Sequence, residues 1–97
     1  MYEVIIKDGI ATCDFSGRLD TLACQVMVVD LRSQIKQMPD KLIFDMKDVD
    51  YIASAFLRVC IEAAQTMPEG AFAIKNVDPV IKKTFMIAGL DNLLHVK

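Results

Sequence analysis

Strand and helix periodicities alternate along this chain, and the alternation constrains the fold more than any other feature of the sequence. The chain opens with two β-rich segments, Tyr2–Lys7 and Ile10–Ser16, separated by Asp8-Gly9. An Asp-Gly pair readily supplies the two positive φ angles of a type I′ turn, so these segments predict a β-hairpin. Gly17 is expected to end the second strand.

Helices and short strands are predicted after the hairpin, and their ends carry recognisable capping residues. Asp20 or Thr21 is the expected N-cap of the first helix, and Asp78 is that of the last helix. The predicted elements are a helix that begins directly after Asp20 or Thr21 and runs to about Met38, a strand at Leu42–Phe44, a helix from Ser54 to about Thr66, a strand at Ala71–Lys75, a helix between Pro79 and Gly89, and an edge strand at Leu93–Val96.

The apolar residues of these segments indicate which parts are buried. The first helix has two adjacent apolar rows, Leu22, Val26 and Val29 beside Val28, Leu31, Ile35 and Met38. Such a wide stripe is typical of a helix lying on a sheet. The second helix has few polar residues, so it is either enclosed or keeps an apolar surface near its start for a partner. The run Leu42–Phe44 predicts a strand covered on both faces, and Asp45–Ala53 predicts an acidic loop.

The order of elements predicts the architecture. Strands that alternate with helices favour parallel pairing through right-handed crossovers, while the hairpin adds one antiparallel pair. We therefore predict an α/β fold with a mixed, mostly parallel sheet of four to five strands, opening with a β-hairpin, and with three to four helices. A chain of 97 residues buries one modest core, so residues 1–97 are expected to form a single domain.

Composition and charge argue against several classes of function. The formal net charge is −2 and no block of Lys or Arg is present, so the chain offers no electrostatic footprint for nucleic acid. No apolar run approaches the roughly 20 residues of a membrane span, and the N-terminus does not resemble a signal peptide. Cys13, Cys24 and Cys60 lack CxxC spacing and have apolar neighbours. They are expected to be buried reduced thiols in a cytoplasmic protein.

The usual signatures of an enzyme are missing from the sequence. The single histidine, His95, is two residues from the last residue, and a triad of Ser54, His95 and Asp45 is disfavoured against an ordinary edge-strand histidine. Neither the glycine-rich nucleotide motifs nor the HExxH metal motif occurs. We therefore expect a non-enzymatic protein without a cofactor or a metal.

Ser54 is the most informative residue for function. It is expected at a helix start beside the carboxyl ends of the strands, where open α/β sheets meet their ligands. Unpaired N–H groups at a helix start favour anions, so this hydroxyl is a candidate phosphoacceptor; the alternative is that Ser54 is only an N-cap. The nearby Asp45, Asp48 and Asp50 are a candidate metal cluster or a solvated acidic loop, and they would also repel a phosphate on Ser54.

Three blocks of sequence, in this order and at these spacings, resemble a known family. They are Ser16-Gly17-Arg18-Leu19-Asp20, the segment Leu42–Val59, and Asn76–Val80 followed by Ala88-Gly89-Leu90. Along essentially its whole length the chain resembles the STAS domains, and in particular the bacterial anti-sigma factor antagonists.

The resemblance implies a partner switch. In that family the unmodified antagonist binds a serine-kinase anti-sigma factor of the GHKL type, the kinase phosphorylates the serine that corresponds to Ser54, and a PP2C-type phosphatase reverses the modification. The residues expected to contact the partner are Asp20, Asp45, Tyr51, Ala53, Ala55, Phe56 and Arg58. The alternatives are a scaffold subunit of a membrane phospholipid transport complex and a small-ligand-binding STAS domain. A weak dimer also stays open.

Two residues at this helix start depart from the family pattern. Ala53 stands where the family usually has Asp, and Phe56 stands where it usually has Gly. The change at position 53 removes a carboxylate that could cap the helix or orient the serine hydroxyl. Phe56 either fills the core or enlarges the contact patch.

Overall fold

A computed structural model describes residues 2–37, 39–68 and 70–90. The elements in chain order are β1 (Tyr2–Lys7), β2 (Ile10–Leu19), α1 (Thr21–Lys36), β3 (Lys41–Ile52), α2 (Ser54–Thr66), β4 (Phe72–Lys75) and α3 (Pro79–Ile87). The predicted order of elements is confirmed from the opening hairpin to the last helix. The strand predicted at Leu93–Val96 lies outside the described residues. So do Met38 and the single histidine, His95.

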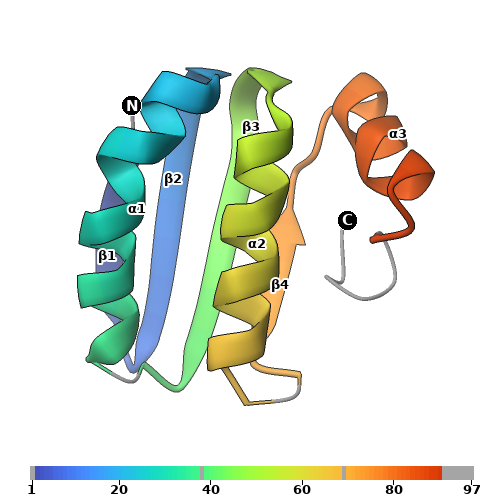
Figure 1. The fold of residues 1–97 in the computed structure, drawn as a ribbon. Helices are drawn as coiled ribbons and strands as arrows, with labels where there is room; N and C mark the ends of the chain where they lie inside the picture. The colour runs from blue at the N-terminus through green and yellow to red at the C-terminus, as the bar shows by residue number, and fades with distance from the viewer. Residues whose placement is uncertain (1, 38, 69, 91–97) are drawn as a thin grey trace.

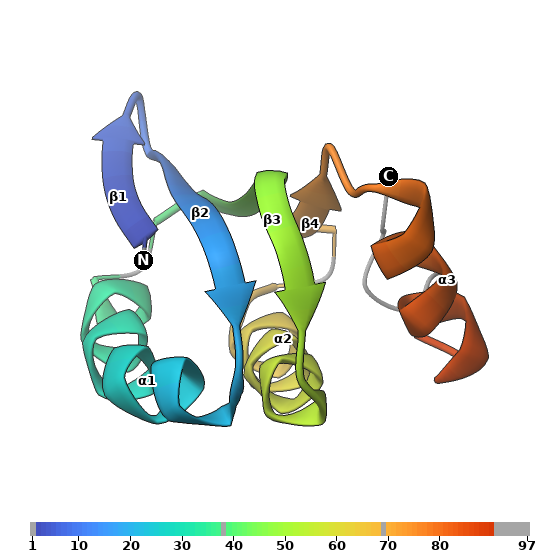
Figure 2. The same cartoon turned by 90° about the horizontal axis from the view of Figure 1, so that it is seen from above.

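The four strands form one sheet in the order β1-β2-β3-β4. β1 pairs with β2 antiparallel, and the two other pairings are parallel. Helices α1 and α2 lie side by side on one face of this sheet, and α3 stands beside its β4 edge (Figures 1 and 2). The predicted mixed α/β fold is therefore confirmed, with four strands and three helices in the described part of the chain.

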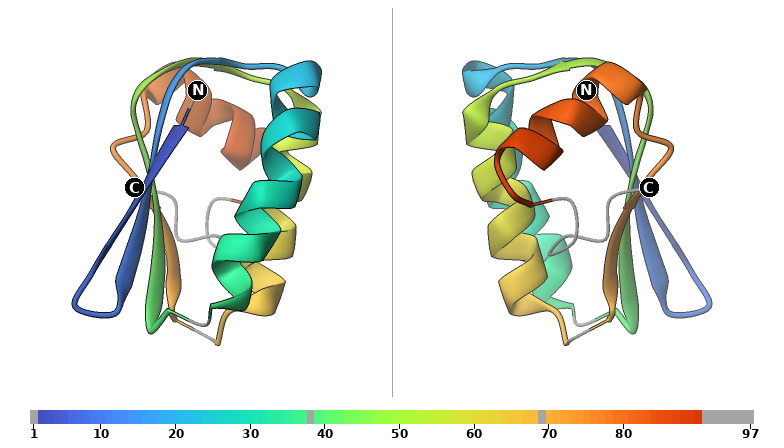
Figure 3. Two further views of the ribbon diagram at one scale, coloured as in Figure 1. Left: turned by 90° about the vertical axis from the view of Figure 1, so that its left-hand side faces the viewer. Right: turned by 90° about the vertical axis from the view of Figure 1, so that its right-hand side faces the viewer.

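The opposite face of the sheet carries no helix among the described residues (Figure 3). Ile43 lies on that face and is only half-buried, between two fully buried neighbours in β3. The expectation that the strand containing Leu42–Phe44 is covered on both faces is therefore wrong. A run of three apolar residues does not show whether the second face of the strand is covered, because an apolar residue can point towards the core or towards solvent.

The opening hairpin turns as the Asp-Gly pair predicts. Asp8 and Gly9 have φ angles of 53° and 79°. The Gly9 carbonyl accepts hydrogen bonds from the backbone N–H groups of Asp40 (2.7 Å) and Lys41 (3.3 Å), which anchor the start of β3. The φ of Gly9 lies in the left-handed region that favours glycine, and a Cβ there would also require the Asp40 carboxylate to move, because it would lie 2.3 Å from Oδ2.

Both central strands are longer than the sequence pattern indicates. Gly17 does not end β2: it adopts a φ of 78° inside the strand, next to a shift in the β2–β3 register. Likewise Asp45–Ala53 is not a loop, because β3 continues to Ile52. Two register shifts give β3 an extra residue each, so its buried side chains Met46, Val49 and Ile52 are three apart. Such β-bulges hide the two-residue alternation that marks a strand.

Helix α1 begins at a side-chain cap, and only one of its two apolar rows packs on the sheet. Oδ1 of Asp20 accepts a hydrogen bond from the backbone N–H of Ala23 at 2.9 Å, which confirms Asp20 as the N-cap. The buried residues of the helix are Cys24, Met27, Leu31 and Ile35. The row of Leu22, Val26 and Val29 is exposed, so the expectation that it lies on the sheet is wrong. Because α2 covers the neighbouring part of the sheet, only one side of α1 packs against the strands.

The core is built around aromatic rings from four elements. Phe15 lies edge-on to Phe44 and to Phe56, with ring centroids 5.0 and 5.3 Å apart, and Phe44 lies edge-on to Phe72 at 4.9 Å. Edge-to-face pairs of this kind add to the stabilisation from burial. The second helix, α2, is thereby fixed to the sheet from its first turn.

The three cysteines are free and buried, as the sequence predicts. Burial raises the pKa of the Cys13 thiol to about 12, and it also raises the pKa values of Cys24 and Cys60. These thiols are therefore poor nucleophiles near neutral pH.

The last helix is capped at both ends as its sequence indicates. The Asp78 carboxylate accepts a hydrogen bond from the Val80 N–H at 2.9 Å. At the other end Gly89 has a φ of 73°, and the Leu90 N–H donates to the Phe85 carbonyl at 2.9 Å. Leu90 packs against the core, which completes the predicted left-handed cap.

Candidate functional site

The candidate site lies where β2 and β3 end and the two sheet-covering helices begin. Both helices start at the same end of the strands (Figure 1). The backbone N–H of Ala53 donates to the carbonyl of Leu19 at 2.9 Å, which joins the β3–α2 junction to the β2–α1 junction. Ser54 therefore lies beside the start of α1, at the carboxyl ends of two parallel strands, where ligands of open α/β sheets are found.

Ser54 is the first residue of α2 and is exposed. The N-cap is Ala53, in extended geometry with φ −91° and ψ 164°, so the interpretation of Ser54 as a simple N-cap is wrong. Within residues 2–37, 39–68 and 70–90 no side chain caps this helix, and no acidic residue lies in its first turn. The partial positive charge of the helix start is thus not neutralised by a carboxylate of its own helix, and this favours an anion at Ser54.

Four of the predicted contact residues lie near Ser54 along the chain or at the adjoining junction. Asp20 caps α1 directly after Leu19, and Ala53 and Ala55 are half-buried beside the serine. Arg58 is exposed one helical turn after Ser54, which is the spacing at which two helical side chains meet.

Tyr51 and Arg18 form a further pair at the ends of the same strands. They are register partners, and the guanidinium carbon of Arg18 lies 3.9 Å from the centroid of the Tyr51 ring. This cation–π contact holds both exposed side chains in place. Arg18 escaped the sequence reasoning because nothing in the sequence shows which residue of β2 faces Tyr51 across a shifted register.

Two of the predicted contact residues do not belong to this surface. Asp45 lies within β3, about 20 Å from the end of that strand at ~3.3 Å per residue. Its Oδ1 accepts hydrogen bonds from Asn76 Nδ2 at 3.1 Å and from the Lys47 N–H at 3.2 Å, and its Oδ2 lies 4.0 Å from Lys75 Nζ. Phe56 is fully buried in the aromatic core. The core interpretation of Phe56 is therefore confirmed, and its interpretation as part of the contact patch is wrong.

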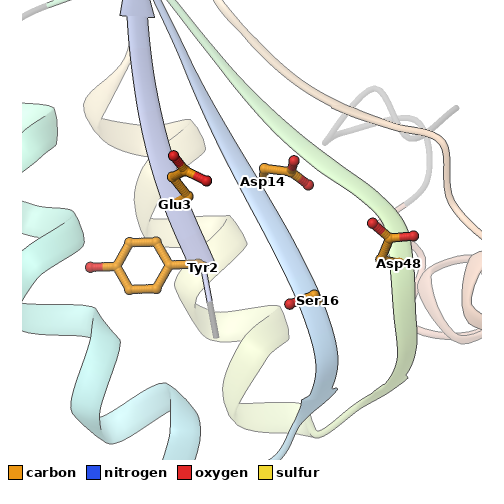
Figure 4. Close-up of a pocket in the computed structure, with 5 residues that line it drawn as sticks. All are labelled: Tyr2, Glu3, Asp14, Ser16 and Asp48. Carbon is orange, nitrogen blue, oxygen red and sulfur yellow. The ribbon is translucent and has the colours of Figure 1, made fainter.

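Polar side chains also line a pocket on the helix-free face of the sheet. Figure 4 shows Glu3, Asp14, Ser16 and Asp48 next to one another across β1, β2 and β3. With Tyr2 they line a depression of about 380 Å³. Asp45 pairs instead with β4, so the aspartates considered as a metal cluster do not converge. Across residues 2–37, 39–68 and 70–90, no three His, Cys, Asp or Glu side chains are grouped to hold a metal ion.

Two polar contacts hold α1 in position beside its neighbours. Arg32 Nε lies 2.8 Å from Glu62 Oε1, which joins α1 to α2. The Tyr2 hydroxyl donates to Asp30, which joins α1 to β1. The pKa of the Tyr2 hydroxyl is raised, mainly by burial and also by the neighbouring Asp30 carboxylate. These contacts join the later halves of α1 and α2 to each other, and α1 to β1.

The sequence model of one family matches the whole chain. The STAS domain model covers residues 1–97. The chain belongs to the STAS domain family. Among the described residues, no helix has both the length and the apolar character needed to cross a membrane.

Individual relatives of this STAS domain are distant in sequence. BtrV of Bordetella bronchiseptica, a protein that carries the name of an anti-sigma factor antagonist, is 23% identical over 91 residues, which cover 92% of this chain and 78% of BtrV. An anti-sigma factor antagonist from Mycobacterium paratuberculosis matches with a TM-score of 0.89 at 18% identity, over 99% of this chain and 83% of that one.

The STAS domain also matches the anti-sigma factor antagonist SpoIIAA in two states. The unphosphorylated form has a TM-score of 0.85 and the phosphorylated Bacillus form 0.74, each at 15% identity and over 100% of this chain. These matches cover 88% and 91% of the SpoIIAA chains. At such identities they show the shared fold.

Proposed function

We propose that this STAS domain is a cytoplasmic, non-enzymatic anti-sigma factor antagonist. It binds a serine-kinase anti-sigma factor of the GHKL type, the kinase phosphorylates Ser54, and a PP2C-type phosphatase removes the phosphate. The observation that carries the proposal is the exposed hydroxyl of Ser54 at the first position of α2, on a helix start that no side chain caps.

The surroundings of Ser54 suit a phosphate. A phosphoserine carries close to two negative charges, and the N–H groups of the first turn are donors for them. The N-cap, Ala53, has no side chain that could occupy these donors. Arg58, one turn further on, is placed to pair with the phosphate along the helix.

The same surroundings suit a protein partner that is released by phosphorylation. Asp20, Tyr51, Ala53, Ala55 and Arg58 belong to the two joined strand–helix junctions or to the turn that follows them. A phosphate on Ser54 adds charge within this surface, and a bound partner would have to remove that charge from water. The cost of desolvation therefore favours dissociation.

The names of the related proteins support the proposal, because they are names of anti-sigma factor antagonists. SpoIIAA has been solved with and without its phosphate, and BtrV and the Mycobacterium protein carry the name of antagonists. A chain with their fold and an accessible serine at a helix start has the parts that such a switch requires.

The test combines the purified chain with each GHKL-type serine kinase encoded in the source genome. We expect one kinase to form a complex by calorimetry and, with ATP, to modify Ser54 as located by mass spectrometry. Ser54→Asp should weaken that complex. The matched control is Thr84→Asp, which adds the same charge at an exposed position of α3 and should leave binding unchanged.

Two results would count against this function. One is the absence of any complex with the wild-type chain, and the other is a complex equally insensitive to both aspartate substitutions. Co-purification with an ABC ATPase in place of a kinase would instead favour the scaffold role in a transport complex.

A further inference from the structure

Helix α1 exposes a row of aliphatic side chains that the fold does not use. Leu22, Val26 and Val29, here called the α1 ridge, are 70%, 74% and 68% exposed. No charged residue occurs between Thr21 and Val29. A contiguous apolar and uncharged row on a surface helix is typical of an interaction site.

The ridge points directly away from the sheet. The buried side of α1 is formed by Cys24, Met27, Leu31 and Ile35. By the period of the α-helix, the three ridge residues lie on the opposite side of α1. They are therefore available to a partner without any rearrangement of the core.

The ridge and Ser54 face the same way. On α2 the buried residues are Phe56, Val59, Cys60 and Ala63, which places Ser54 and Arg58 on the side away from the sheet. The two helices lie side by side (Figures 1 and 2) and are joined by the ion pair of Arg32 and Glu62. Packed helices are about 8–10 Å apart, so both rows fit within one protein interface.

The size of the ridge decides between two occupants. An aliphatic side chain offers roughly 60–120 Å² of apolar surface, so three that are about 70% exposed supply about 130–250 Å². A stable interface needs about 800 Å² from each partner. The ridge alone is therefore too small for a stable dimer of this chain, and any partner that covers it must also contact a neighbouring surface; the surface around Ser54 faces the same way and supplies that continuity.

We infer that the α1 ridge is the apolar flank of the surface that binds the kinase-type anti-sigma factor. The kinase presents a row of uncharged apolar side chains to α1 while its neighbouring residues contact the start of α2. The ridge then contributes apolar contact area to binding, and control comes from Ser54 beside it. This inference rests on the proposed function, and it adds the chemistry of the partner surface.

The test uses the kinase that binds the wild-type chain in the screen described above. The variant Leu22→Gln/Val26→Gln/Val29→Gln removes the apolar row and keeps helix-compatible residues at exposed positions. The matched control is Val80→Gln/Ile87→Gln, which changes residues that are 75% and 79% exposed on α3. We expect the ridge variant to bind at least about tenfold more weakly and the control to bind within twofold of wild type.

Further measurements separate the outcomes. Circular dichroism should show equal helix content and melting for all three proteins, and a ridge variant that does not fold is replaced by the single change Val26→Gln. Binding of the ridge variant within twofold of wild type, or an equal loss in the control, would overturn the inference while leaving the Ser54 switch intact. Sedimentation of the wild-type chain as a dimer that the ridge variant abolishes would also overturn it. A wild-type chain that binds no kinase contradicts both proposals.

Discussion

The substitution Ala53→Asp tests how the start of α2 is built. Ala53 already has the extended backbone of an N-cap, so a new side chain there requires no change in φ or ψ. In the two other helices an aspartate at the corresponding place accepts a backbone hydrogen bond at 2.9 Å, Asp20 from Ala23 and Asp78 from Val80. The substitution should create the same bond at the start of α2.

The expected gain in stability follows from these two caps. A capping aspartate contributes about 0.5–2 kcal/mol relative to alanine, part of it from its charge at the helix N-terminus. We expect the free energy of unfolding to rise by about 1 kcal/mol, which raises Tm by roughly 4–8 °C for a domain of this size. Phosphorylation of Ser54 should become faster, because the substitution restores the carboxylate that the family usually has at this position, where it can orient the serine hydroxyl.

Thermal and urea unfolding followed by circular dichroism measure the first effect, and phosphate transfer from the bound kinase measures the second. Ala53→Asn is the matched control, because it can cap the helix without adding charge. It should be stabilised to a similar extent, and its gain in the rate of phosphorylation should be smaller than that of Ala53→Asp. A melting temperature of Ala53→Asp equal to or below that of the wild type would refute the view that this helix start lacks only a side-chain cap.

Two further predictions concern the core. Phe56→Ala should lower the free energy of unfolding by about 3–5 kcal/mol in urea titrations, because it removes a fully buried ring in contact with Phe15; a loss below ~1 kcal/mol would contradict the buried placement. Burial raises the pKa of the Cys13 thiol from 9.0 to about 12, so as the pH rises the thiol ionises in the unfolded chain before it ionises in the folded chain. The contribution of this thiol to the free energy of unfolding should therefore be full below pH 9 and should fall as the pH rises towards 12. Cys13→Ala should reduce this fall, by about 1 kcal/mol at pH 10, and an unchanged pH dependence would show that the thiol is not buried.

Local signals in the sequence predicted most element ends and the family. The Asp8-Gly9 turn, the Asp20 and Asp78 caps and the Gly89 terminus are each confirmed, since each depends on a few neighbouring residues. Ser54 was recognised as the first-turn residue of a helix from the same kind of signal. Its role as phosphoacceptor stays a prediction.

The errors arose where distant segments determine the outcome. The sequence predicts a loop at Asp45–Ala53, where β3 in fact continues to Ile52, because two bulges space Met46, Val49 and Ile52 in threes. The sequence predicts Asp45 at the carboxyl end of its strand, near Ser54, whereas β3 continues for seven residues beyond Asp45, which lies near Lys75. Phe56 could not be assigned to core or surface until the positions of Phe15 and Phe44 were known.

The sequence by itself determined the order of the elements, their capped ends and the STAS family, because these depend on local conformational preference and on short motifs. Only the tertiary structure decided which of the two apolar rows of α1 meets the sheet. Helical periodicity shows that Leu22, Val26 and Val29 share a face, but it cannot show which face the sheet covers. That choice depends on the space left beside α2, and it left the α1 ridge exposed beside Ser54.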